Sequence, residues 1–149
     1  MDATIDAVRV AGTPDGPVGV LVLAVEEDED VLPIFVGIEE ATSIARGLDA
    51  TDIGRPLTHD LLLDVMEELG SRIDRVVVSS IEDGTYHADL HIQTPREMVV
   101  VDARPSDSLA LAARTNAPIE LDEEVYEDGR RKPEEFEELT DIREVAESA

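Results

Sequence analysis

The first third of the chain changes from strand-like to helix-like spacing of its apolar residues. Residues 18–25 are nearly all apolar, which is typical of a strand buried on both of its faces. Between residues 38 and 48, apolar side chains recur three and four positions apart, as on one stripe of a helix. The pattern therefore predicts strands at residues 4–11, 18–25 and 31–37, followed by a helix at residues 38–48.

A second group of elements follows after a connection that contains Gly54 and Pro56. The apolar stripe of residues 59–69 predicts a helix, with Thr58 as its N-cap and Gly70 at its end. Glu82-Asp83-Gly84 is typical of a hairpin turn. We expect strands at residues 73–81, 85–93 and 98–102, a helix from 105 to about 115 and a short strand at 119–121.

Two segments of the chain resemble each other. Residues 36–45 and 103–112 each pass from a strand through a turn to an acidic residue, and then into a helix rich in small side chains. In this comparison Glu40 corresponds to Asp107. The match is short, so both a duplication and a chance similarity stay open.

The charge balance points to a particular cellular environment. The 149 residues include 36 acidic and 12 basic side chains, giving a formal net charge of −24. Such a chain repels itself strongly in dilute buffer, but in molar salt the screening length falls to about 3 Å. We therefore expect a protein from a salt-loaded cytoplasm, such as that of a halophilic archaeon. An acidic disordered protein is the alternative, and the periodic apolar residues disfavour it.

Several classes of protein are excluded by what the chain lacks. It contains no cysteine, so disulfides, thiol catalysis and cysteine-bound zinc are impossible. No apolar run reaches the roughly 18 residues that span a bilayer. The N-terminus carries Asp2 and Asp6 instead of a basic and then apolar leader. We expect a cytoplasmic protein with no membrane partner.

The first group of candidate functional residues lies at the start of the second predicted helix. Arg55 precedes that helix, and His59 and Asp60 fall in its first turn. An imidazole at this position could act as a general base or as a metal ligand. In the structural alternative, Thr58 caps the helix, Asp60 complements the helix dipole, and His59 is simply exposed to solvent.

The second group lies at residues 101–112, where an apolar strand runs through a polar turn into a helix. Four polar residues crowd this turn: Asp102, Arg104, Ser106 and Asp107. Carboxylates bind Mg²⁺ or Mn²⁺, and arginine binds phosphate through two parallel hydrogen bonds, so the set suits metal-assisted phosphodiester cleavage. In the structural alternative, Asp102 and Arg104 form a salt bridge. Ser106 and Asp107 then cap the helix.

These motifs are similar to those of a known family. Residues 55–62 and 102–112 resemble the two signature segments of the bifunctional nuclease domain family, and residues 32–41 and 83–90 resemble further segments of it. The resemblance implies an α+β domain over residues 1–126, built from duplicated strand–helix–strand–strand units. Their mixed and antiparallel sheets would curl toward a barrel, with the helices packed outside.

The resemblance also implies a nuclease that acts on both RNA and DNA. We expect this nuclease to have little sequence specificity and to be a homo-oligomer. The implied catalytic residues are His59, Asp60, Arg104 and Asp107. The implied substrate-binding residues are Arg55, Arg104 and Ser106. A divalent metal ion, Mg²⁺ or Mn²⁺, would be held by Asp102, Asp107 and Glu40. The alternative is a non-catalytic oligomeric or small-anion-binding module, in which the same residues serve as helix caps and salt bridges.

The last part of the chain lies outside this resemblance. Residues 127–149 are highly acidic, with a basic run at Arg130-Arg131-Lys132 and apolar residues at Phe136 and Leu139. We expect this acidic tail to form a marginal helix or a partly disordered segment beside the domain.

Overall fold

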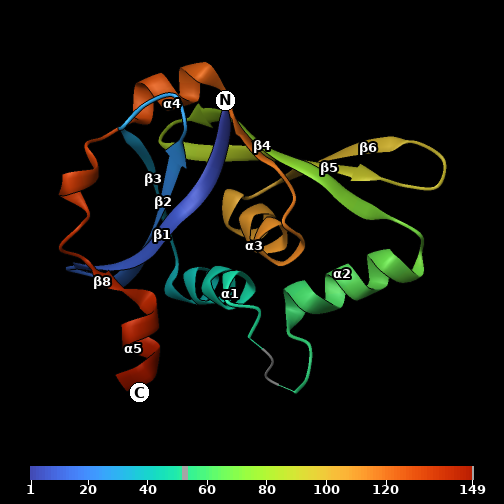
Figure 1. Ribbon diagram of the computed structural model, residues 1–149, viewed down its shortest axis with the longest axis horizontal. Coiled ribbons are helices and arrows are strands. Elements are labelled where there is room, and N and C mark those ends of the chain that lie inside the picture. Colours follow the sequence, from blue (N-terminus) through green and yellow to red (C-terminus); the bar gives the residue numbers. More distant parts are fainter. Residues whose placement is uncertain (52–53, 149) are drawn as a thin grey trace.

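The computed structural model describes residues 1–51 and 54–148 and shows a mixed α+β fold (Figure 1). Eight strands and five α-helices lie within those residues. The strands are β1 (Asp2–Thr13), β2 (Gly16–Val25), β3 (Val31–Val36), β4 (Arg72–Glu82), β5 (Thr85–Gln93), β6 (Met98–Ala103), β7 (Ile119–Leu121) and β8 (Thr140–Asp141). The helices are α1 (Ile38–Leu48), α2 (Thr58–Glu68), α3 (Pro105–Thr115), α4 (Glu123–Gly129) and α5 (Ile142–Ser148), with a 3-10 turn at Pro133–Glu135.

The strands form one sheet that does not close into a barrel. Their order is β3-β2-β1-β7-β4-β5-β6, and β8 pairs with β1 beside this path. All neighbours are antiparallel except β4 and β7, which run parallel. Because β3 and β6 end the path without pairing with each other in the described part of the chain, the sheet keeps two open edges.

Each half of the sheet is a run of three antiparallel strands followed by a helix. The first half is β1-β2-β3-α1, and the second is β4-β5-β6-α3. This order differs from the expected strand–helix–strand–strand unit. Glu40 and Asp107 are nonetheless each the third residue of their helices, after an extended N-cap at Gly37 and Arg104 respectively. The two halves therefore place an acidic side chain at the same position of a helix.

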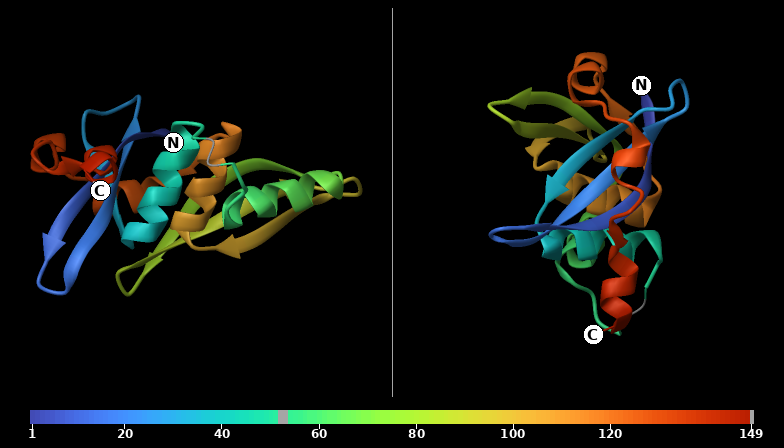
Figure 2. Two further views of the ribbon diagram at one scale, coloured as in Figure 1. Left: turned by 90° about the horizontal axis from the view of Figure 1, so that it is seen from below. Right: turned by 90° about the vertical axis from the view of Figure 1, so that its left-hand side faces the viewer.

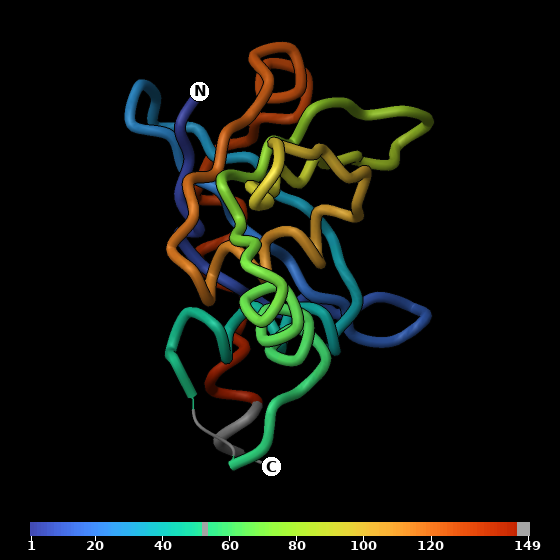
Figure 3. The backbone as a smooth tube through the Cα atoms, turned by 90° about the vertical axis from the view of Figure 1, so that its right-hand side faces the viewer, coloured from blue at the N-terminus to red at the C-terminus, as the bar shows by residue number. Residues whose placement is uncertain are grey.

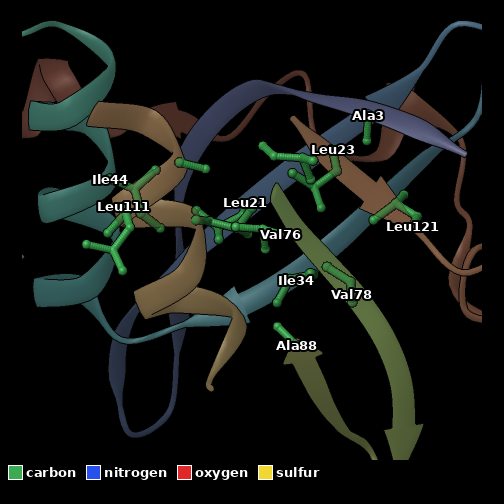
Figure 4. Packing of buried hydrophobic residues seen from close by; sticks show 14 of the residues in the cluster. Ala3, Leu21, Leu23, Ile34, Ile44, Val76, Val78, Ala88, Leu111 and Leu121 are labelled. Carbon is green, nitrogen blue, oxygen red and sulfur yellow. The ribbon is translucent and has the colours of Figure 1, made fainter. Parts of the chain in front are cut away.

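Helix α3 lies in the middle of the molecule and not on its outside, which corrects the expectation that the helices pack around the sheet (Figures 1 and 2). Its residues 108–112 are almost completely buried. Small side chains explain this position, because they let neighbouring backbones approach closely. In α1, a Cβ added at Gly47 would lie 3.0 Å from the Cβ of Ala113 in α3. Ile44 of α1 and Leu111 of α3 lie together in the main core (Figure 4).

Strand β2 is buried on both faces, as its continuous apolar sequence predicts. Leu21 and Leu23 belong to the main core with the helices. Val20 and Val22 point to a second cluster on the opposite face, where Phe136 packs against them. The alternation of side chains along a strand therefore supplies both clusters from one run of residues.

The acidic segment after residue 126 packs against this second face, and its last part contacts β1 and the end of α1. Strand β8 pairs with β1 at Arg9 and Val10, and Ile142 is buried in the main core. Arg143 of α5 forms an ion pair with Asp49, at 2.9 Å between Nη2 and Oδ1. Phe136 and Leu139 thus cover the second face of the strands, whereas Ile142 extends the main core.

Helix α2 begins at Thr58, one residue earlier than predicted. Leu57 is its N-cap, and the Oδ2 atom of Asp60 accepts a hydrogen bond from the Leu57 N–H over 3.1 Å. The prediction of Thr58 as N-cap is therefore wrong, because a carboxylate in the first turn already binds the free N–H group. Figure 3 shows α2 at the front, projecting from the strands behind it. Among residues 1–51 and 54–148, no helix combines the length and apolar character needed to cross a membrane.

Candidate active site

The starts of α2 and α3, which are far apart in the sequence, meet beside α1. A cleft of about 480 Å³ opens there. His59 contributes to it from α2, Arg104 and Asp107 from the start of α3, and Glu40 and Ser43 from α1. The structure thus brings four of the sequence-predicted residues into one cavity.

His59 and Asp107 are in direct contact. The Nε2 atom of His59 lies 2.9 Å from Oδ1 of Asp107, and only 14% of the imidazole side chain is exposed. On the other side of the carboxylate, Nε of Arg104 donates to Oδ2 of Asp107 over 3.0 Å. Glu40 also faces this guanidinium, with its Oε1 atom 3.6 Å from Nη1 of Arg104. The expectation that His59 is simply an exposed residue is therefore wrong.

Opposing effects act on the pKa of Asp107. Partial burial raises its pKa, but the hydrogen bonds and positive charge of Arg104, together with the hydrogen bond from His59, outweigh burial and lower it below the ordinary carboxyl value. Asp107 is therefore ionised at neutral pH. A fixed negative charge beside Nε2 favours the tautomer of His59 that carries its proton on that nitrogen.

The second nitrogen of His59 contacts a residue that the sequence analysis missed. Oγ of Ser43 lies 2.7 Å from Nδ1 of His59, and it also accepts a hydrogen bond from Nη2 of Arg114 over 3.2 Å. Since a guanidinium can only donate, the Ser43 oxygen accepts from Arg114 and its own hydrogen is free to be donated to Nδ1. This arrangement matches the His59 tautomer that carries its proton on Nε2, against Asp107. Ser43 and Asp107 thus hold the ring from both sides.

Arg114 is the second missed residue, and it connects three helices. From α3, its guanidinium donates to Oδ1 of Asp60 over 2.7 Å, to the carbonyl of Ser43 over 3.0 Å and to the carbonyl of Ala110 over 2.9 Å. Only 9% of its side chain is exposed. A charged residue near the end of the small, apolar stretch 108–113 was the available indication in the sequence, because a buried charge requires partners.

Asp60 faces away from the cleft that holds His59. Arg114 binds one of its oxygens, and the N–H of Leu57 binds the other. Partial burial raises the pKa of Asp60, but these hydrogen bonds and the charge of Arg114 lower it overall. Both oxygens of Asp60 are therefore engaged in contacts that fix the start of α2 to α3.

Three other predicted residues do not line the cleft of His59 and Asp107. Arg55 lines a neighbouring pocket with Asp60 and Arg114. Ser106 is 5% exposed and lies in a different pocket, beside Pro105. Asp102 is an exposed residue of β6, opposite Asp89 of β5.

The three predicted metal ligands are consequently not assembled as one set. Glu40 and Asp107 approach each other through Arg104, whereas Asp102 lies outside the lining of this cleft. In the described part of the chain, no group of three or more His, Asp and Glu side chains is arranged to hold a metal ion. Two of the three predicted ligands, Glu40 and Asp107, do line the same cleft, together with a third carboxylate, Glu39.

Comparison with known proteins shows the family of this chain. The model of the bifunctional nuclease domain matches residues 21–134, which include all the residues of the cleft. The chain belongs to the bifunctional nuclease domain family. The family resemblance of residues 55–62 and 102–112 is thereby confirmed.

Relatives of this bifunctional nuclease domain occur in bacteria and plants. An uncharacterized protein of Mycobacterium tuberculosis is 36% identical over 124 residues, covering 83% of this chain and 73% of that protein. Bifunctional nuclease 2 of Arabidopsis thaliana is 27% identical over 120 residues, covering 77% of this chain. Bifunctional nuclease 2 of rice (Oryza sativa subsp. japonica) is 26% identical over 123 residues. The matched region is 36% of the Arabidopsis protein and 38% of the rice protein.

Proposed function

We propose that this protein is a nuclease that hydrolyses phosphodiester bonds in RNA and DNA with little sequence specificity. The observation that carries the proposal is the contact between His59 and Asp107, with Arg104 bound to the same carboxylate in one cleft. A proton carrier and a phosphate-binding cation stand side by side there, in a chain of the bifunctional nuclease domain family. The names of the plant relatives support the same activity.

Arg104 and His59 have distinct roles in the proposed reaction. Arg104 is 65% exposed and can turn its guanidinium to a substrate phosphate, where it neutralises charge that develops on the phosphoryl oxygens. A water oxygen attacks phosphorus, the bond to the leaving oxygen breaks, and the water proton passes to Nδ1 of His59 through the Ser43 hydroxyl. Asp107 stabilises the imidazolium that results, and the leaving oxygen then regains a proton from it or from solvent.

Arg114 and Asp60 act as positioning residues in this proposal, whereas Ser43 both relays the proton and orients the imidazole. Ser43 orients the imidazole through Nδ1, and Arg114 holds Ser43 by two hydrogen bonds. Asp60 fixes Arg114 and with it the start of α2, which carries His59. The role of Asp60 is therefore to place the neighbouring catalytic residue, although the sequence motif suggested a direct one.

A divalent metal ion fits two of the three ligands that the sequence suggested. Mg²⁺ is commonly held by one or two carboxylates together with substrate phosphate and water, and Glu40 and Asp107 supply such a pair in the cleft. A bound ion would add positive charge for the phosphoryl oxygens. Asp102 is left out of this proposed set, because it does not line the cleft.

The charge of the chain determines the conditions under which such a nuclease can bind its substrate. A net charge of −24 repels nucleic acid in dilute buffer, whereas molar salt screens this repulsion together with most long-range attraction. Binding then depends on short-range contacts with arginine and a metal ion. We accordingly propose that the protein works in a salt-loaded cytoplasm, such as that of a halophilic archaeon.

Exposed apolar surfaces support the further proposal that the protein is a homo-oligomer. Leu61, Val65 and Leu69 of α2 are 55%, 47% and 69% exposed, and Val100 of the outer strand β6 is 54% exposed. Figure 2 shows α2 lying along the arm formed by β4, β5 and β6. Large exposed apolar residues of this kind mark contact surfaces. Sedimentation equilibrium in molar KCl should give a multiple of the chain mass, and Val65→Lys should lower it.

The test of the nuclease proposal is cleavage of plasmid DNA and of RNA in molar KCl with Mg²⁺ or Mn²⁺. Replacing His59 by Ala or Asp107 by Ala should reduce cleavage by at least about a hundredfold. Asp102→Ala, another acidic residue near α3 but outside the cleft, serves as the matched control. Equal cleavage by all three variants and the parent would identify a contaminant. Loss of thermal stability in Asp107→Ala without any turnover in the parent would instead favour the non-catalytic module.

A further inference from the structure

A second pocket adjoins the proposed active site and is lined by three arginines. It has a volume of about 430 Å³, and Arg46, Arg55 and Arg114 all contribute to its wall. Arg46 comes from the last turn of α1, Arg55 from the connection before α2, and Arg114 from α3. Three separate segments therefore contribute arginine side chains to this pocket, in a chain that has only 12 basic residues.

Among the described residues that line this pocket, positive charges outnumber negative ones, in contrast to the protein as a whole. Its described lining includes one carboxylate, Asp60, and Arg114 already neutralises it at 2.7 Å. Neither Arg46 nor Arg55 forms an ion pair within the described part of the chain, and both are exposed. In a protein with 36 acidic residues, two such arginines beside one cavity provide a localised site for an anion.

The position of the pocket indicates which anion it would bind. Arg46 and Leu57 line both this pocket and the cleft that contains His59, Arg104 and Asp107. The two cavities are therefore adjacent, so that a strand of nucleic acid with its scissile phosphate at Arg104 can extend past Arg46 into the second pocket. We propose that Arg46 and Arg55 bind the phosphate that flanks the scissile bond of a polynucleotide strand.

This proposal rests on the proposed nuclease function and specifies its substrate. A single phosphodiester occupies only the cleft, whereas an oligonucleotide occupies both cavities and places its flanking phosphate between Arg46 and Arg55. In molar salt such short-range contacts replace the long-range attraction that screening removes. The protein should consequently prefer oligonucleotides and longer strands to substrates that contain one phosphate.

The test compares Arg46→Ala, Arg55→Ala and the double variant with Arg96→Ala. Arg96 lies in the exposed turn between β5 and β6, away from both cavities, so its loss changes the net charge equally. Cleavage is measured on a trinucleotide and on bis(4-nitrophenyl) phosphate, which has no flanking phosphate. Each pocket variant should raise KM for the trinucleotide by about tenfold. That rise should exceed any effect on the small substrate at least fivefold.

Binding of a labelled single-stranded oligonucleotide, followed by fluorescence anisotropy against KCl concentration, separates the two proposals. Loss of one phosphate contact should reduce the slope of log K against log salt by about 0.7. If the parent does not cleave but the pocket variants still weaken binding in this way, the nuclease proposal fails and the phosphate subsite stands. If the pocket variants match Arg96→Ala in both assays, the subsite is refuted. Inorganic phosphate that binds as tightly as the oligonucleotide would also refute it, in favour of a small-anion site.

Discussion

Replacing Arg114 by Met tests how the three helices around the proposed active site are held together. The substitution keeps an unbranched apolar side chain but removes the hydrogen bonds to Asp60, to the Ser43 carbonyl and hydroxyl, and to the Ala110 carbonyl. Among the described residues, the Asp60 carboxylate then retains the Leu57 N–H as its only hydrogen-bond partner. We expect a lower free energy of unfolding and reduced cleavage, since Ser43, which contacts His59, loses the two hydrogen bonds that position it.

The size of this effect follows from the burial of the ion pair. Removing one partner of a fully buried pair costs about 3–5 kcal/mol. Arg114 is 9% exposed, but Asp60 is 37% exposed, so water compensates part of the lost interaction. We therefore expect Arg114→Met to lower the free energy of unfolding by about 2–3 kcal/mol. Arg104→Met removes an ion pair whose arginine is 65% exposed and should cost far less.

Urea unfolding at a fixed KCl concentration measures both variants and a double-mutant cycle. Asp60→Asn keeps an oxygen that can accept the Leu57 N–H but removes the charge. Combined with Arg114→Met, it should leave the double variant about 1 kcal/mol more stable than the sum of the single effects predicts. Strict additivity, or an Arg114→Met variant as stable as the parent, would refute the inference that this ion pair joins α2 to α3.

Three further predictions concern other parts of the molecule. Ser108→Ala should stabilise the protein by about 1 kcal/mol in urea unfolding, because the buried Ser108 hydroxyl has no hydrogen-bond partner among the described residues; destabilisation would contradict this. The pKa values of Asp60 and Asp107 are lower in the folded state than in the unfolded chain. The two ionised carboxylates therefore stabilise the fold above the ordinary carboxyl pKa of about 4, and this contribution is lost as the pH falls through their folded-state pKa values. Unfolding measured from pH 5 to pH 2 should accordingly depend less on pH in Asp60→Asn than in the parent. EDTA should abolish cleavage and Mg²⁺ should restore it, with Glu40→Gln needing a higher Mg²⁺ concentration than Asp102→Asn; equal requirements would count against Glu40 as a ligand.

Local sequence patterns predicted most of the secondary structure, because each depends on neighbouring residues. The apolar run of β2 and the hairpin at residues 83–84 were predicted correctly. So was the start of α3 after Arg104, where Pro105 occupies the first helical position. The start of α2 was misplaced by one residue, because the sequence does not show whether Thr58 or the carboxylate of Asp60 binds the free N–H groups.

The segment after residue 126 shows the limit of composition as a guide. Its high charge suggested a marginal helix or disorder, yet Ile142 reaches the main core and Phe136 packs on the outer face of β2. A few apolar residues are enough to attach a charged segment when a sheet offers an uncovered face. That face exists only once β1, β2 and β3 have paired.

The sequence by itself determined which residues stand at the two helix starts, because turns, caps and proline act within a few positions of the chain. It thereby identified His59, Arg104 and Asp107. Only the tertiary structure decided that these side chains meet, that Ser43 contacts His59 and is itself held by Arg114, and that Asp102 lies apart. The physical reason is that these contacts join separate helices, and their distances depend on how closely small residues such as Gly47 and Ala113 allow α1 and α3 to pack.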